Sequence, residues 1–273
     1  MPIPPNPAQL CWMSTLRIVT WNINSLRLRL KLLPGLIEQL RPDVICLQET
    51  KVPDELFPMA EVQALGFPHV LHWGMKGYNG VAILSRLPLR RLDAPNWCSK
   101  GDCRHLSAEI EGGVTIHNFY VPAGGDIADR EANVKFGHKL DFITEARAHF
   151  AANRPTRSVL VGDLNIAPME HDVWSHKQLL DVVSHTPIET EGLRAWQSEG
   201  WHDALRQFVP PHEKLYTWWS YRNRDWRGSN RGRRLDHVWT TPDLTPISHQ
   251  ILVDARDWVQ TSDHVPVCVE VQV

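Results

Sequence analysis

Blocks of alternating or continuous apolar residues recur along the chain, and these patterns predict β-strands. Apolar residues spaced three and four apart predict helices between several of them. We expect strands at 16–23, 43–48, 80–85, 107–110, 114–120, 157–164, 235–240, 248–253 and 265–273, and helices at 25–40, 54–65, 129–150, 175–184 and 189–199. Each half opens with strand, helix, strand. The pattern predicts an α+β domain of two stacked sheets with helices on their outer faces.

The first thirteen residues stand apart from this pattern, because they hold four prolines and no charged residue. They lack the basic start and apolar stretch of a secretory signal. We therefore treat residues 1–13 as a disordered or non-native extension and residues 14–273 as one domain. Met1 and Met13 both remain candidates for the natural start.

Composition narrows the class of protein. The chain has 273 residues, 42% hydrophobic and 22% charged, and no apolar run approaches the roughly 20 residues that span a membrane. Five cysteines without regular spacing indicate unpaired thiols in a reducing compartment. The net charge is −2, but residues 213–235 hold seven positive and two negative side chains, which leaves −7 on the rest. A basic segment on an acidic body favours a polyanionic partner.

Polar side chains cluster where the predicted strands begin or end, although they are far apart in sequence. These residues are Asn22, Glu49, Tyr120, Asp163, Asn165, Asp236, Asp263 and His264. They can meet only if the strands that carry them pack side by side. Carboxylates and amides suit a hard cation such as Mg²⁺, which takes one or two carboxylates together with substrate phosphate. The pattern therefore predicts a metal-dependent phosphodiesterase.

Two pairs of residues suggest how the catalytic roles could be divided. Asp163 and Asn165 are two residues apart, so on an extended backbone both side chains point the same way. One can handle a proton while the other donates a hydrogen bond to phosphate. Asp236 and His264 suggest a carboxylate–imidazole pair, in which the carboxylate fixes the imidazole tautomer. Whether Asp163 or His264 serves as the general base stays open.

These residues lie in motifs that resemble the exonuclease III family of apurinic/apyrimidinic endonucleases, within the wider endonuclease/exonuclease/phosphatase superfamily. The resemblance runs from about residue 16 to residue 273. The matching motifs are Trp21-Asn22-Ile23-Asn24, Leu47-Gln48-Glu49-Thr50-Lys51, Gly77-Tyr78-Asn79-Gly80, Tyr120-Val121-Pro122, Gly162-Asp163-Leu164-Asn165, Tyr216-Thr217-Trp218-Trp219-Ser220-Tyr221-Arg222 and Ser262-Asp263-His264. Tyr120 and the aromatic block that begins at Tyr216 are the most specific of these.

The resemblance implies a fold and a set of roles. The fold would be a four-layer αββα sandwich of two stacked mixed β-sheets flanked by helices. Glu49 would be the main ligand of Mg²⁺, with Mn²⁺ as a substitute. The other metal or phosphate positions would be Asn22, Asp163, Asn165, Asp263 and His264. Asp163 would act as general acid/base, Asn165 would steady the transition state, Tyr120 would contact phosphate and Asp236 would orient His264.

The same resemblance implies double-stranded DNA with abasic sites or 3′ ends as the partner. The DNA-binding residues would be Trp218, Trp219, Arg222, Arg224, Arg227, Arg231 and Arg233. The enzyme would incise 5′ to abasic sites, or remove nucleotides and blocking groups from 3′ ends, and leave a 3′-hydroxyl. We expect a monomer in the cytoplasm, near the nucleoid in a bacterium. The balance of activities and the number of metal ions stay open.

Two positions depart from the family pattern. Ala123 follows Tyr120-Val121-Pro122 where many relatives carry Asn, and Arg233 stands where relatives often carry Trp or Leu. Two rival hypotheses are a phosphodiesterase or phosphatase that acts on lipid headgroups or inositol phosphates, and an inactive DNA-binding module. The basic aromatic segment argues against the first rival. The complete set of site residues argues against the second.

Overall fold

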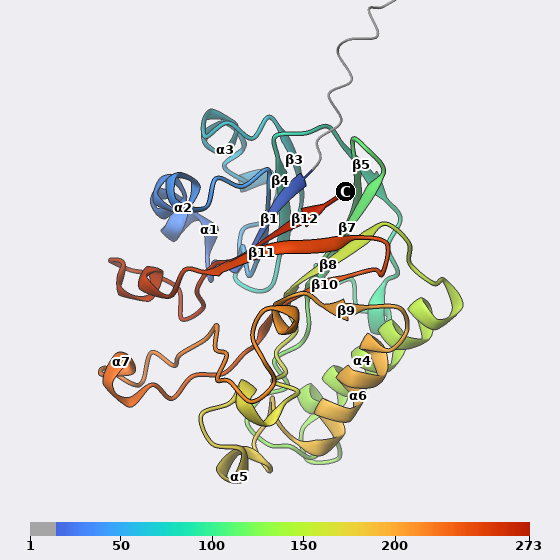
Figure 1. Cartoon of the computed structure of the whole chain (residues 1–273), viewed down its shortest axis with the longest axis vertical. Coiled ribbons are helices and arrows are strands. Elements are labelled where there is room, and N and C mark those ends of the chain that lie inside the picture. Colours follow the sequence, from blue (N-terminus) through green and yellow to red (C-terminus); the bar gives the residue numbers. More distant parts are fainter. Residues whose placement is uncertain (1–14) are drawn as a thin grey trace, which may run out of the picture.

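Two mixed sheets of six strands each pack face to face in the computed structural model, which describes residues 15–273 (Figure 1). The expectations for residues 1–13 lie outside the described residues. The first sheet has the order β11-β12-β1-β2-β4-β3, and the second has the order β5-β6-β7-β8-β10-β9. The strands are β1 Thr15–Asn22, β2 Val44–Gln48, β3 His69–Trp73, β4 Val81–Ser85, β5 Leu89–Leu92, β6 His105–Ile110, β7 Val114–Tyr120, β8 Ser158–Asp163, β9 His202–Asp203, β10 Asp236–Thr240, β11 Thr245–Ile251 and β12 Val267–Gln272.

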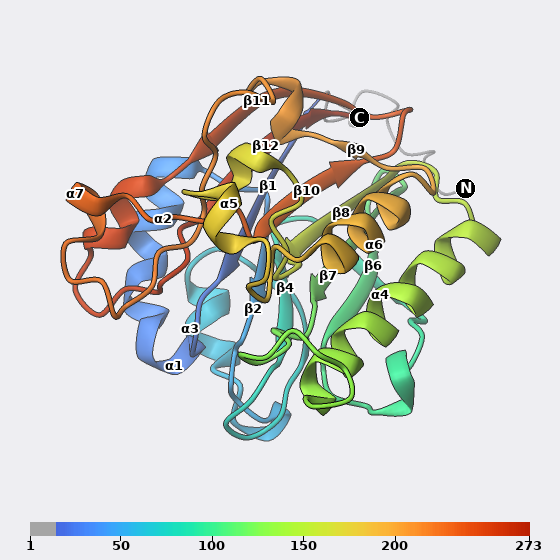
Figure 2. The same ribbon diagram turned by 90° about the horizontal axis from the view of Figure 1, so that it is seen from below.

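Helices cover the outer face of each sheet, so the molecule has four layers (Figure 2). The α-helices are α1 Leu26–Arg29, α2 Leu33–Leu40, α3 Met59–Ala64, α4 Val134–Ala152, α5 His176–Leu179, α6 Pro187–Gln197 and α7 Trp226–Ser229. Short 3₁₀ helices lie at Leu30–Leu32, Asp54–Leu56, Trp97–Ser99, Glu170–Asp172, Leu205–Gln207 and Val253–Asp257. Helices α1–α3 flank the first sheet, whereas α4 and α6 pack together on the second. The predicted αββα sandwich is confirmed.

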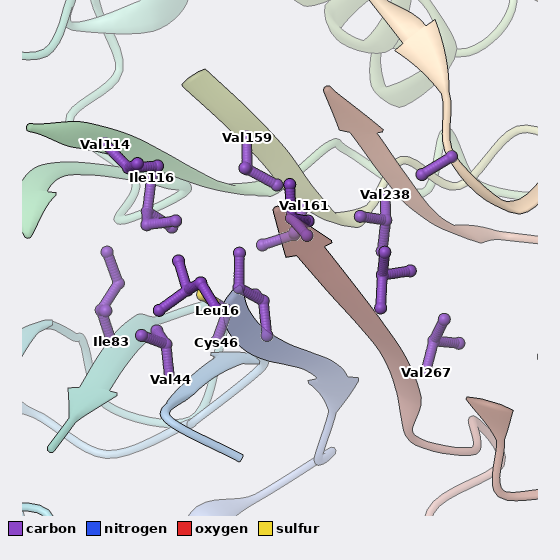
Figure 3. Packing of buried hydrophobic residues seen from close by; sticks show 14 of the residues in the cluster. Leu16, Val44, Cys46, Ile83, Val114, Ile116, Val159, Val161, Val238 and Val267 are labelled. Atoms are coloured by element: carbon purple, nitrogen blue, oxygen red, sulfur yellow. The ribbon is translucent and has the colours of Figure 1, made fainter. Parts of the chain in front are cut away.

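The core between the sheets follows from alternation along the strands. Leu16 of β1 lies across the interior from Val159 and Val161 of β8 (Figure 3), and Ile18 belongs to the same buried cluster. The intervening residues of β1 point outward, where Trp21 packs with the apolar side of the helices. Full burial of a Val, Leu or Ile side chain contributes about 1.5–3 kcal/mol. Alternating residues of one strand therefore supply apolar side chains to both faces of the sheet. Each sheet is packed between the other sheet on one face and helices on the other.

Three predicted helices are shorter than their apolar spacing suggested. The stretch 25–40 divides into α1, a 3₁₀ turn and α2, and α2 has Pro34 in its first turn. The stretch 54–65 becomes a 3₁₀ turn and α3, separated at Pro58. Proline lacks an amide hydrogen and restricts the preceding residue, so it starts a new helix and cannot continue an old one. The predicted helix 175–184 is a single turn, α5.

Three strands, β3, β5 and β9, were not predicted from the sequence. β3 and β5 are sheet edges and β9 has two residues. The residues of β3 are all half-buried, and β5 reads Leu-Arg-Arg-Leu, so neither strand shows a clean alternation. An edge strand is covered on fewer sides, and its sequence is therefore less constrained.

Strand direction gathers the polar clusters at one edge of the sandwich. β1 runs parallel to β2, and β7 runs parallel to β8, so their carboxyl ends lie at the same edge. β10 is antiparallel to β8, and its first residue Asp236 stands opposite Asp163. β12 is antiparallel to β1, which brings the preceding segment, with Asp263 and His264, to the same edge.

A buried amide pair connects the two sheets directly behind this edge. Gln48 of β2 donates from Nε2 to Oδ1 of Asn118 of β7 at 2.7 Å. Asn118 Nδ2 in turn donates to the carbonyl oxygens of Leu47 and Ala82 at 3.0 and 2.9 Å. Buried polar groups of this kind are stabilising only when paired. The pair therefore sets the position of one sheet relative to the other where Glu49 and Tyr120 follow. Within residues 15–273, no helix has the length and apolar character needed to cross a membrane.

Candidate active site

The Asp163 carboxylate is the centre of the site, and four donors point at it. Asn22 Nδ2 lies 2.8 Å from Oδ2, and Asn165 reaches both oxygens, with its backbone N at 2.9 Å and its Nδ2 at 3.2 Å. His264 Nε2 lies 3.6 Å from Oδ2. Burial raises the pKa of Asp163 to about 7, against the opposing effect of His264 and with a further contribution from Asp236. A carboxyl group with such a pKa can exchange protons near neutral pH.

His264 forms an ordered pair with Asp236 at the start of β10. The imidazole Nδ1 lies 2.8 Å from Asp236 Oδ2, and Thr217 Oγ1 donates to the same oxygen at 2.6 Å. Burial lowers the pKa of His264, but Asp236 and Asp163 outweigh it and raise the pKa to about 10. The ring is therefore an imidazolium at neutral pH, with Nε2–H directed toward Asp163. The predicted carboxylate–imidazole pairing is present in the geometry.

Glu49 follows β2 in a left-handed backbone conformation, with φ of 50°. This conformation is strained for a residue with a side chain and is retained mainly where the surroundings fix it. Asn22 Nδ2 donates to Glu49 Oε1 at 2.9 Å, and Lys51 Nζ lies 2.7 Å from Oε2. Burial raises the pKa of Glu49, but Lys51 and Asn22 outweigh it, and the pKa is lowered overall. Asn22 therefore bridges the Glu49 and Asp163 carboxylates.

Tyr120 ends β7 beside these carboxylates. Its side chain is buried, and the Arg104 guanidinium lies 4.8 Å from the ring centroid. Burial, together with Glu49 and Asp163, raises the pKa of Tyr120 well above its usual value. The phenol thus stays protonated and can donate a hydrogen bond to an anion.

Asp263 lies at the other side of the site. Asn24 Nδ2 donates to its Oδ1 at 3.1 Å, and Trp218 Nε1 donates to its Oδ2 at 2.9 Å. The two donors and His264 lower its pKa despite burial. Lys51 Nζ also donates to Asn24 Oδ1 at 2.6 Å, so a polar chain runs from Glu49 through Lys51 and Asn24 to Asp263.

The residues present fit a divalent cation best at Glu49. An ammonium group already contacts this carboxylate, which shows that a cation can lie there, and the surrounding groups are oxygen donors of the kind Mg²⁺ prefers. Asp163, Asp236 and His264 also offer ligand atoms within 4.8 Å of one another. There, however, His264 is a cation bonded to Asp236, which disfavours a second positive charge. Asn22 donates from Nδ2 to the Glu49 and Asp163 carboxylates, and its Oδ1 accepts from the backbone N of Asn24.

A cleft of about 870 Å³ opens above these groups. Glu49, Asn165 and His264 line it at the catalytic end, and Trp174 and Trp218 contribute aromatic walls. The volume of the cleft and the polar side chains that line it suit a sugar-phosphate unit.

The predicted DNA-binding residues divide into two groups. Trp218, Arg222, Arg231 and Arg233 line the cleft. Trp219, by contrast, is 3% exposed, packs on Trp226 and donates to Asn230 Oδ1, so its ring forms no part of the cleft wall. Arg227 is exposed and pairs with Asp254 and Asp257, and Arg224 is exposed outside the cleft lining. The position of Trp219 therefore does not support the prediction that it binds DNA, because only 3% of the residue is exposed and it does not line the cleft.

Sequence reasoning missed several residues of the site. Trp174 lies in a loop without any motif, yet it lines the cleft, and Arg231 stacks over its ring at 4.7 Å. Lys139 is fully buried in α4 and donates to the Asn165 carbonyl oxygen at 2.8 Å. A lysine at a buried position of a helix is the one signal that could have drawn attention to it.

Comparison with known proteins agrees with this geometry. Residues 19–264 match the Endonuclease/Exonuclease/phosphatase family. The chain is 31% identical over 270 residues to exodeoxyribonuclease III of Haemophilus influenzae, covering 93% of this chain and 99% of the relative. It is 29% identical to the DNA repair nuclease APEX1 of Danio rerio, covering 93% of this chain and 81% of that protein.

Solved structures give the same answer. An AP endonuclease from Archaeoglobus fulgidus superposes with a TM-score of 0.85 at 31% identity, covering 93% of this chain and 98% of the other. A 3′ phosphatase from Neisseria, bound to a product DNA hairpin, superposes with a TM-score of 0.85 at 30% identity and the same coverage. The chain therefore belongs to the endonuclease/exonuclease/phosphatase family, in the exonuclease III group of AP endonucleases, and is a hydrolytic enzyme.

Proposed function

We propose that the chain is a Mg²⁺-dependent DNA repair phosphodiesterase that cleaves next to abasic sites and at blocked 3′ ends, leaving a 3′-hydroxyl. The observation that carries the proposal is the convergence of Glu49, Asp163 and His264 at one edge of the sandwich. Asn22 Nδ2 donates to Glu49 at 2.9 Å and to Asp163 at 2.8 Å, and His264 Nε2 lies 3.6 Å from Asp163 Oδ2. Relatives named for exodeoxyribonuclease III and DNA repair nuclease activity support the choice of DNA.

The chemistry assigned to the residues is an in-line displacement. Water attacks phosphorus, the bond from phosphorus to the 3′ oxygen breaks, and that oxygen takes up a proton from solvent to become the 3′-hydroxyl. Asp163, with a pKa near 7, accepts the proton of the attacking water. The His264 imidazolium and the Tyr120 phenol donate to the phosphate oxygens, where negative charge develops. Asp236 holds the imidazole in position.

This division of roles favours Asp163 over His264 as the base. An imidazolium has no lone pair with which to take a proton, and the Asp236 contact keeps it charged. Asn165 fixes the Asp163 carboxylate by donating to both of its oxygens. We assign the metal to Glu49, with Asp263 as the second acidic group at the site. When bound, Mg²⁺ supplies positive charge that stabilises the phosphate oxygens during cleavage.

Binding to DNA is assigned to the cleft and its rim. Trp218 and Trp174 provide aromatic surface for a flipped sugar without a base, and Arg222 and Arg231 provide charge for phosphates. Binding through arginine should weaken as salt increases, because phosphate contacts release counterions. We further propose a monomeric enzyme of a single domain that works in the cytoplasm, which fits the free thiols of Cys46, Cys98, Cys103 and Cys268.

The test is incision of a duplex that carries one abasic analogue. Wild-type protein should cut the strand 5′ to the analogue in Mg²⁺, and EDTA should abolish cutting. Glu49→Ala should shift the Mg²⁺ titration to higher concentrations, because it removes the carboxylate assigned to the metal. An exposed carboxylate that does not line the cleft, changed in Glu55→Ala, serves as the matched control and should leave the titration unchanged.

The rival phosphoesterase hypothesis is tested in the same assay. Phosphoinositides and lipid headgroup phosphodiesters are offered beside the abasic duplex. Hydrolysis of these substrates without incision of DNA would replace our proposal. Binding to the duplex without incision in Mg²⁺ or Mn²⁺ would favour an inactive DNA-binding module.

A further inference from the structure

In the cleft wall, the extended segment that contains Trp218 lies between Arg233 and His264. The backbone of Trp218 pairs with Arg233 on one side and with His264 on the other. The N–H groups of Trp218 and Arg233 each donate to the carbonyl oxygen of the other at 3.0 Å. This pairing places Arg233 and His264 on either side of Trp218, and both residues line the cleft.

The guanidinium of Arg233 is positioned but not neutralised. Nη1 donates to the Val183 carbonyl oxygen at 3.1 Å and to Ser184 Oγ at 2.7 Å, and the group lies 5.4 Å from the centre of the Trp218 ring. Its Nε is buried and has no partner within residues 15–273. No carboxylate of the described chain forms an ion pair with it.

The neighbouring charges confirm that this cation is uncompensated. Arg234, the next residue, is fully buried but pairs with Asp172 and Asp203 at 2.9 and 2.5 Å. Glu189, the acid that most influences Arg233, is itself paired with Lys139 at 2.5 Å. A largely buried arginine stays charged and is costly without an anion nearby. The Arg233 residue lines the cleft, which can admit such an anion.

Phosphate chemistry indicates which anion would reach this arginine. A phosphate diester held by His264 and Tyr120 has one ester oxygen that leaves and a second substituent that stays on phosphorus. A neutral sugar as that substituent would be better matched by an apolar wall than by a guanidinium. A carboxylate or phosphate there would instead match the planar fork of a guanidinium.

We propose that Arg233 is a specificity-determining residue that recognises a negatively charged group on the blocking ester of a damaged 3′ end, such as a phosphoglycolate. The inference rests on the proposed function. In the reaction, water adds to phosphorus and the bond to the 3′ oxygen breaks. The DNA leaves with a 3′-hydroxyl. The other product, the phosphate that bears the carboxylate, is then released from Arg233.

The test compares two primers in the same duplex, one ending in 3′-phosphoglycolate and one ending in the neutral-tailed 3′-phosphohydroxyethyl ester. Wild-type protein should show a higher kcat/KM on the glycolate. Arg233→Leu should lower the glycolate-to-hydroxyethyl ratio by about 10- to 100-fold, the loss expected for a hydrogen-bonded charged pair. Arg233→Lys keeps the charge and should give an intermediate ratio. Arg90→Leu, on edge strand β5 and paired with Glu109, is the matched control and should leave the ratio unchanged.

A binding measurement separates this inference from the proposed function. Fluorescence anisotropy in EDTA gives the affinity for both primers without turnover, so an enzyme that cuts neither primer would contradict the proposed function alone. Equal ratios for wild type and Arg233→Leu in both assays would overturn the inference. An equal loss on both primers would show that Arg233 only supports the wall. Thermal melting of each variant identifies a folding defect. If Arg233→Leu is misfolded, the glycolate-to-hydroxyethyl ratios of wild type and Arg233→Lys decide whether the inference holds.

Discussion

At the scale of single residues, the site places two titratable groups in opposite states. Burial raises the pKa of Asp163 to about 7, whereas two carboxylates raise the pKa of His264 to about 10. One group can therefore take up a proton near neutral pH while the other remains a cation. Environments that separate two groups in this way are a common basis for assigning acid and base roles.

The residue-scale prediction concerns Asp163→Asn. The change removes the group that accepts the proton, so incision of the abasic duplex should fall by about 10²- to 10⁴-fold. Folding should not suffer, because a buried carboxyl with a raised pKa is itself a cost that the neutral amide avoids. We expect a thermal midpoint equal to or above that of wild type. Asp181→Asn, at an exposed position, is the control. A fully active Asp163→Asn protein would refute the assignment.

At the scale of elements, the close pairing of β7 and β8 delivers Tyr120 and Asp163 to the site side by side. Gly162 precedes Asp163 and has φ of 142°. A Cβ at this position would lie 1.9 Å from the Phe119 carbonyl oxygen. Only glycine permits this approach, since backbone atoms cannot move aside as a flexible side chain can.

Gly162→Ala should therefore push the two strands apart and damage both stability and catalysis. We expect a loss of about 1–3 kcal/mol or more in the free energy of unfolding, as for an overpacked core, measured by urea titration. Gly112→Ala is the matched control, because Gly112 also has a positive φ, of 103°, but has no atom within 4 Å of the added Cβ. Its cost should be limited to conformational strain of roughly 1 kcal/mol. Equal costs for the two variants would contradict the steric explanation.

At the scale of the whole molecule, the second sheet holds three neutral histidines, of which His105 and His237 are buried and His117 is half-buried. Trp97 Nε1 donates to His105 Nδ1 at 3.2 Å, and His105 Nε2 lies 3.2 Å from His117 Nδ1, which fixes uncharged tautomers. His237 Nε2 contacts the Ile166 carbonyl oxygen at 2.8 Å. Burial lowers the pKa of His117 and of His237 to about 3, and lowers that of His105 well below its usual value.

These histidines predict acid sensitivity of the fold. Between pH 6.5 and about 3 the unfolded chain binds protons that the folded chain cannot, so stability falls as pH falls through this window. Each histidine contributes up to about 1.4 kcal/mol per pH unit. His117→Gln should reduce the slope of unfolding free energy against pH between pH 6 and 4.5. His212→Gln, at an exposed position, should leave the slope unchanged. Identical slopes for all three proteins would rule the explanation out.

The sequence by itself determined the chemical groups of the site and most of the sandwich. Alternation and apolar blocks are local properties, so strands such as β1, β2 and β8 could be placed from them, and the polar residues at their ends could be named. The edge strands β3 and β5 could not be placed, because their side chains are only partly covered and alternate poorly.

Only the tertiary structure decided which members of a motif face the cleft. Trp218 lines the cleft, whereas Trp219 is buried. Within residues 15–273 Arg233 forms no salt bridge, whereas Arg234 is neutralised by Asp172 and Asp203. Adjacent residues of the same type carry no local signal that separates them. Their roles depend on pairing and burial by segments far along the chain, and these are set only when the two sheets close on each other.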